Sequence, residues 1–115
     1  MKNKFEIYDW SGTKMFGVES EYKVLNHFTS YDWTPEKAQE IIDGIKSTIA
    51  NNAEYKWANE DLMLVSHPSV GVIFWDLMKT RGQGSGIKAS QDLVLSHQEF
   101  IDFMEDFKKF IVENM

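Results

Sequence analysis

Apolar and polar residues alternate with a period of two early in the chain, which is the pattern of half-buried strands. The alternation in residues 4–10 (KFEIYDW) divides the side chains between two faces, Phe5, Ile7 and Asp9 on one and Glu6, Tyr8 and Trp10 on the other. Ser11 and Gly12 then predict a turn, and residues 13–28 continue in β-prone residues. We expect one bent strand or two short strands there, with a break near Gly17 and the polar residues that follow it.

The spacing changes to that of a helix at Thr34. Thr34 is a good N-cap, Pro35 suits the first helical position, and Glu36 lies where the helix dipole favours an anion. The apolar residues that follow have the spacing of a buried helical stripe, namely Ala38, Ile41, Ile42, Ile45 and Ile49. Two asparagines at 51–52 end the pattern, so the sequence predicts an amphipathic helix between these limits.

The middle of the chain returns to strand patterns. We expect strands around residues 55–57 and 62–65, and a third in the nearly continuous apolar run of residues 70–78. The short polar segment 66–69 predicts a turn, which makes the last two strands a hairpin. Residues 92–96 add a further short strand or lead directly into the final helix.

The final helix has the strongest signals in the sequence. Ser96 and Glu99 have the spacing of a capping box, which marks a helix start. One unbroken apolar stripe follows, formed by Phe100, Phe103, Met104, Phe107, Phe110 and Ile111. Such a stripe is typical of a helix packed on a core, with the acidic opposite face in solvent.

The order of strands, helix, hairpin and helix predicts an α+β fold. We expect an antiparallel sheet of about four to five strands with two amphipathic helices packed on one face. The chain has 115 residues, no cysteine and no internal repeat, so residues 1–115 are expected to form a single domain that needs no disulfides.

The formal net charge is −6, which argues against a nucleic-acid partner because binding phosphates requires clustered Lys and Arg. Residues 79–89 are the exception, with three basic residues, no acid and three alternating glycines. A phosphate loop would join a strand to a helix N-terminus, and this segment matches neither that setting nor a known glycine motif. It reads best as a flexible connector or a secondary contact, and the acidic remainder favours solubility or a basic protein partner.

No constellation of residues predicts catalysis. The three histidines, His27, His67 and His97, have no metal-ligand spacing, and we expect His27 to be half-buried and the other two to be exposed. Ser66-His67 and Ser96-His97 are adjacent pairs, the wrong geometry for a nucleophile and its base, and no nucleophile-elbow motif is present. Asp9, Asp76 and Asp92 are isolated in the sequence. We therefore expect no enzyme, no cofactor and no metal.

The connection into the first helix carries two aromatic residues beside carboxylates. Trp33 either packs as a hydrophobic staple on the helix or, with Tyr31, belongs to an exposed edge that binds a partner. Glu60 and Asp61 form a second carboxylate pair, but adjacent strand residues point to opposite faces.

In layout the chain resembles small bacterial immunity proteins, in particular those of contact-dependent growth inhibition systems. An acidic chain with an N-terminal hairpin, a helix at "TPEKAQEII", a hairpin with a tryptophan and a closing helix at "LSHQEFIDFMEDFKKF" carries the resemblance. The order of elements is also similar to the uncharacterised YacL family. Both are likenesses of element order and composition rather than of a specific motif.

The resemblance implies a protein that binds a cognate toxin domain, often a nuclease, and blocks it. Acidic and aromatic residues are the expected contacts, namely Tyr31, Asp32, Trp33, Glu36, Glu40, Asp43, Glu60 and Asp61. A small adaptor like the YacL proteins and a small His/carboxylate enzyme are the alternatives. We see no signal peptide and no apolar run long enough to cross a bilayer, so we expect a cytoplasmic protein without membrane or nucleic-acid partners.

Overall fold

The computed structural model describes residues 2–29, 31–80 and 91–115. Its elements are β1 (Asn3–Trp10), β2 (Thr13–Ser20), the 3₁₀ helix η1 (Lys23–Thr29), α1 (Pro35–Asn51), β3 (Tyr55–Ala58), β4 (Leu62–His67), β5 (Gly71–Asp76), α2 (Leu77–Thr80), β6 (Leu93–Leu95) and α3 (His97–Asn114). The glycine-rich segment 79–89 lies mostly outside the described residues, since its positions 81–89 fall in the gap at 81–90. None of the helices in the described ranges is long and apolar enough for a membrane span.

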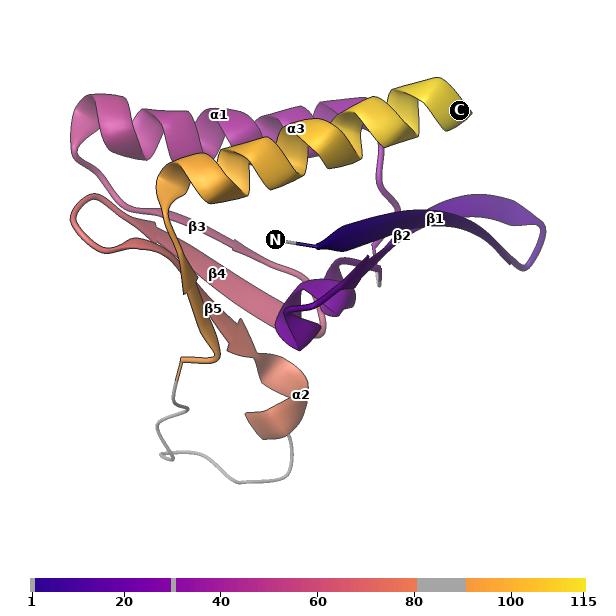
Figure 1. The fold of residues 1–115 in the computed structure, drawn as a ribbon, viewed down its shortest axis with the longest axis horizontal. Helices are drawn as coiled ribbons and strands as arrows, with labels where there is room; N and C mark the ends of the chain where they lie inside the picture. Colours follow the sequence, from indigo (N-terminus) through magenta and orange to yellow (C-terminus); the bar gives the residue numbers. More distant parts are fainter. Residues whose placement is uncertain (1, 30, 81–90) are drawn as a thin grey trace.

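An antiparallel sheet with the order β3-β4-β5-β6 forms one layer, and α1 and α3 lie side by side over one of its faces (Figure 1). Leu62, Leu64 and Ser66 of β4 are buried, while the residues between them are partly exposed. The α+β class, the antiparallel sheet and the helices on one face are therefore as predicted. Residues 92–96 include the short strand β6, one of the two alternatives that the sequence left open.

The N-terminal hairpin does not join that sheet. Among the strands of the described residues, β1 and β2 pair only with each other, and they form an arm that extends to one side of the molecule, beneath the C-terminal half of α3 (Figure 1). Ser11 (φ 52°) and Gly12 (φ 85°) both have positive φ, as the predicted two-residue turn requires. Strand β2 passes through Gly17 unbroken and ends at Ser20.

Residues 23–29 form η1, so the prediction of strand through residue 28 is wrong. Val24, Leu25 and Phe28 are buried and have helical spacing, but the segment is rich in residues that favour strands, so its composition indicated a strand. The short helix also covers the outer edge of β2. The Val18 N–H donates to Oγ1 of Thr29 at 2.9 Å, and the Ser20 N–H donates to Oδ1 of Asn26 at 2.6 Å.

Both long helices begin as predicted. The Lys37 N–H donates to Oγ1 of Thr34 at 3.1 Å, and both hydrogen bonds of the Ser96–Glu99 capping box are formed. The predicted stripe of α1 is wrong at Ile49, which is 56% exposed, because Thr48 is buried in its place. A helical period of 3.6 residues allows either position, and Thr48 tolerates burial because its hydroxyl donates to the Gly44 carbonyl at 3.2 Å.

The core lies between the sheet and the two helices and is unusually aromatic. Phe28 contacts the rings of Trp33, Trp57 and Phe100 at centroid distances of 5.6, 5.5 and 6.0 Å. The hairpin arm joins this core through Phe5, whose ring stacks on that of Phe107 at 5.2 Å. The aromatic stripe of α3 is thus a structural surface that holds both the sheet and the arm.

Candidate functional site

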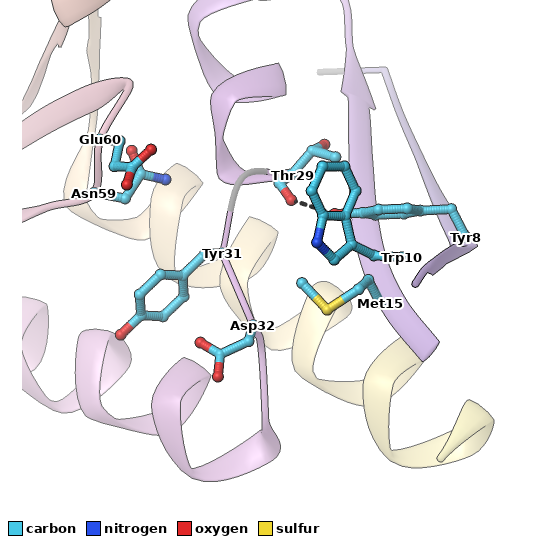
Figure 2. A pocket seen from close by; sticks show the side chains of 8 residues that line it. All are labelled: Tyr8, Trp10, Met15, Thr29, Tyr31, Asp32, Asn59 and Glu60. Atoms are coloured by element: carbon cyan, nitrogen blue, oxygen red, sulfur yellow. Dashed lines mark hydrogen bonds between the residues drawn. The ribbon is translucent and has the colours of Figure 1, made fainter. Parts of the chain in front are cut away.

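An open cleft of about 850 Å³ lies beside the hairpin arm. It is lined by three separate segments of the chain: the arm, the connection between η1 and α1, and the turn between β3 and β4 (Figure 2). The lining residues are Tyr8, Trp10, Met15, Thr29, Tyr31, Asp32, Asn59 and Glu60. The cleft therefore depends on the tertiary fold, since no single segment forms more than one of its sides.

The hairpin side of the cleft follows from the alternation of strand residues. Tyr8 pairs with Met15 across the hairpin, and Trp10 pairs with Thr13, so these side chains share one face of the arm. The Tyr8 hydroxyl donates to the Thr29 carbonyl at 2.8 Å, which ties the arm to η1. Burial, with a smaller contribution from Glu6, raises the pKa of Tyr8. Trp10 is 68% exposed, which leaves a large aromatic surface in contact with solvent.

Tyr31 and Asp32 line the cleft from the connection between η1 and α1, and their side chains point away from Trp10 and Met15 (Figure 2). The Tyr31 ring packs edge-on against Trp33 at 4.8 Å and against Trp57 at 5.3 Å. Trp33 itself is only 4% exposed, and its indole N–H donates to the Phe28 carbonyl at 2.6 Å. Of the two alternatives for Trp33, the structure shows packing in the core rather than an exposed edge, and the Trp33 ring supports Tyr31 from within.

A cation already lies at this side of the cleft. The Lys37 ammonium donates to Oδ1 of Asp32 at 2.8 Å and to the Asp32 carbonyl at 3.1 Å, and it lies 5.0 Å from the Tyr31 ring centroid. The hydrogen bond from Lys37 lowers the pKa of Asp32, and the same bond raises the pKa of Lys37. The second carboxylate oxygen of Asp32, Oδ2, has no partner within the described ranges.

The third side is a turn that Asn59 holds in place. Its Oδ1 accepts hydrogen bonds from the N–H groups of Asp61 (2.8 Å) and Leu62 (2.9 Å), and its Nδ2 donates to the His27 carbonyl at 2.9 Å. The exposed Glu60 follows Asn59 on this fixed turn and lines the cleft. The turn therefore places a carboxylate at a defined position without a long flexible loop.

The structure divides the predicted contact residues into groups. Tyr31, Asp32 and Glu60 come together at the cleft, although the last lies far from the others in sequence. A second group lines a shallow groove of about 480 Å³ along α1, with Glu36, Glu40 and Asp43 beside Lys108. Asp61 does not line the cleft and is partly buried, and its carbonyl accepts the Leu77 N–H at 2.8 Å.

Sequence reasoning missed the hairpin side of the cleft. Tyr8, Trp10 and Met15 line it but were treated only as strand residues. One signal was available, because the alternation placed Tyr8 and Trp10 on the same face and a tryptophan beside a tight turn is hard to bury. What the pattern did not contain is the position of the arm relative to α1 and the β3–β4 turn.

All three histidines have partners that the sequence did not indicate. The partly buried His67 accepts the Ser69 N–H at its Nδ1, at 3.1 Å. Nε2 of the half-buried His27 lies 3.1 Å from Oδ2 of Asp76, and Oδ2 of Asp92 accepts the Asp76 N–H at 2.7 Å, so neither aspartate is isolated. His97 is partly buried rather than exposed, with Nε2 2.8 Å from the His67 carbonyl. The cleft lining contains none of these histidines. Across the part of the chain that the structure describes, no group of three potential ligands is arranged to hold a metal ion.

No family model, curated protein or solved structure matches this chain. The resemblance to immunity proteins and to the YacL family stays a prediction from element order and composition. Function has to be inferred from the cleft and from the charges around it.

Proposed function

We propose that this protein is a cytoplasmic immunity protein that binds and neutralises a basic toxin domain, with a nuclease as the expected class of toxin. The observation that carries the proposal is the cleft, where an exposed tryptophan and a tyrosine stand beside two carboxylates from different segments. Interface hot spots are enriched in Trp and Tyr, and acidic rims select basic partners. The protein would act by occupying a surface, without chemistry, cofactor or metal.

The charge of the whole molecule supports the same class of partner. A net charge of −6 attracts a basic domain over a distance and increases the rate of encounter. Glu36, Glu40 and Asp43 are exposed on α1, which begins three residues after Asp32, and add further negative charge along that helix. Because nucleases bind phosphates with cationic side chains, carboxylates on this surface can take the positions of phosphates in a nuclease cleft.

Co-expression tests the proposal. A bacterial host that expresses the toxin domain encoded beside this gene should grow when the wild-type protein is present and stop growing without it. The double variant Asp32→Lys/Glu60→Lys should lose protection, because two carboxylates become cations that repel a basic surface. The control Asp102→Lys/Asp106→Lys has the same change of charge on the exposed face of α3 and should protect. Growth arrest with the wild-type protein would refute the immunity function.

The acidic face of α1 can be tested separately in the same assay. The triple variant Glu36→Lys/Glu40→Lys/Asp43→Lys should weaken protection if the interface continues along the helix. A variant that protects as well as wild type would restrict the interface to the cleft.

The contact between His27 and Asp76 favours a second candidate, a small enzyme that uses a histidine and a carboxylate. The two hypotheses differ in their response to His27→Ala. Protection from the toxin should survive this substitution, whereas an enzyme that uses the couple would lose its activity.

A further inference from the structure

We propose that the cleft is a binding site for a single guanidinium group, supplied by an arginine side chain that projects from the basic partner. The inference rests on the proposed function for the origin of that arginine, and the binding itself is a property of this protein alone. It deepens the proposal by naming which chemical group the cleft recognises and which residues recognise it.

The first argument is that the site already binds a cation of its own. Lys37 places its ammonium on the Asp32 carboxylate at 2.8 Å and 5.0 Å from the centre of the Tyr31 ring, the distance range of a cation–π contact. The Asp32 side chain is nevertheless 72% exposed, and its Oδ2 has no partner within the described ranges. An exposed pair of this kind is weak, so a second cation can share the carboxylate or replace Lys37.

The second argument is the shape of the site. Trp10, Met15 and Tyr8 provide a largely apolar side of the cleft, separate from the segment that carries Asp32 (Figure 2). Such a surface suits the methylene groups and the flat face of a guanidinium. A volume of about 850 Å³ accommodates a long side chain without displacing the core. Aromatic surface on one side and carboxylate on the other is the combination that a cation with a long apolar stem requires.

The third argument selects arginine over lysine. A guanidinium is planar, stacks on aromatic rings, loses less hydration free energy than an ammonium and donates several hydrogen bonds at once. Hydrogen bonding to the Asp32 carboxylate and packing on an aromatic ring are thus both available to a guanidinium in this cleft, whose third side carries Glu60. A lysine ammonium is a point charge and gains less from the aromatic side.

The experiment titrates the purified protein with N-acetyl-arginine-N-methylamide and follows the indole N–H signals of its four tryptophans by NMR. The Trp10 signal, assigned with Trp10→Phe, should shift and saturate in the millimolar range, whereas that of the buried Trp33 should stay in place. The citrulline amide has the same shape without the charge and should bind at least fivefold more weakly. The lysine amide should also bind more weakly than the arginine amide.

Matched variants separate a specific site from general attraction to an acidic protein. Lys37→Met removes the internal cation and should tighten arginine binding about threefold, the scale of a surface pair. Lys46→Met changes the net charge equally but alters a distant pair with Glu105, and should change affinity by much less. Asp32→Asn should weaken binding at least threefold, while Asp43→Asn, outside the cleft, should not.

Equal binding of the arginine and citrulline amides, equal effects of Lys37→Met and Lys46→Met, or no saturable shift of Trp10 would each overturn the inference. These outcomes leave the immunity function untouched, because protection is measured with the toxin. Conversely, arginine binding without protection would keep the guanidinium site and refute the immunity function.

Discussion

Replacing Gly44 by alanine would add a methyl group where α1 meets the ring of Tyr55 on β3. A Cβ at this position would lie 2.5 Å from both Cδ1 and Cζ of Tyr55, which is closer than carbon atoms approach without movement. The ring must therefore move away from the helix, and β3 lies at the edge of the sheet, so the ring can turn toward solvent. Gly44 thus permits a contact that any other residue would break.

Two effects of opposite sign determine the outcome. Alanine is favoured over glycine inside a helix by about 1 kcal/mol. Displacement of the half-buried Tyr55 ring costs roughly 1–2 kcal/mol, about half of what complete burial of a large side chain is worth. We expect Gly44→Ala in the wild-type protein to leave the stability unchanged or to lower it by up to about 1 kcal/mol. In the Tyr55→Ala variant, where the ring is absent, Gly44→Ala should raise the stability by about 1 kcal/mol.

Urea unfolding of the wild type, both single variants and the double variant measures this difference. The coupling free energy of the four-protein cycle should be about 1–2 kcal/mol. If Gly44→Ala stabilises both backgrounds equally, the coupling is zero and the ring does not lie where the structure places it. A change in the slope m would instead show that the unfolding reaction itself had changed.

Three further results are expected. Trp33→Phe should lower the stability by about 2–3 kcal/mol in urea unfolding, because it leaves the Phe28 carbonyl in the core without its 2.6 Å hydrogen bond from the indole. A loss below about 0.5 kcal/mol would contradict the burial of Trp33. Burial first, and then the charges of neighbouring groups, raise the pKa of Tyr8 and of Tyr55 in the folded protein. Each neutral tyrosine therefore contributes stability that is complete below the ordinary tyrosine pKa of 10.0. This contribution is lost as the pH rises through the higher pKa of the folded state. Phe at either position should reduce this alkaline loss, and an unchanged dependence would refute the assignment. Ser96→Ala should cost about 1 kcal/mol and Ser96→Asp much less, because Asp also caps helices; equal losses would exclude a capping role.

Elements defined by local signals could be predicted from the sequence. The starts of α1 and α3 follow from hydrogen bonds within four residues, so Thr34 and Ser96 identify them directly. The predicted turn at Ser11-Gly12 follows from local dihedral preferences in the same way. For these features the sequence contains all of the interacting groups.

The sequence-based predictions differ from the structure where contacts between distant segments determine whether a residue is buried. Trp33 looks like an exposed aromatic residue beside acids, and only its hydrogen bond to Phe28 and its contact with Trp57 place it inside. Thr48 is buried one turn after Gly44, which lies against Tyr55 of β3, and the period of the stripe does not fix how the helix is rotated on the sheet. The cleft combines residues from three segments, so the sequence could name Tyr31, Asp32 and Glu60 but not group them with Trp10.

The hairpin arm divides two tasks between alternate residues. Phe5, Phe16 and Val18 face the core under α3, while their neighbours Tyr8, Trp10 and Met15 line the cleft. Selection can therefore act on recognition and on folding almost independently within the same eight-residue strands. If the partner that binds the cleft changes its surface, the cleft side of the arm can change by point substitutions, and the scaffold does not have to be rebuilt each time.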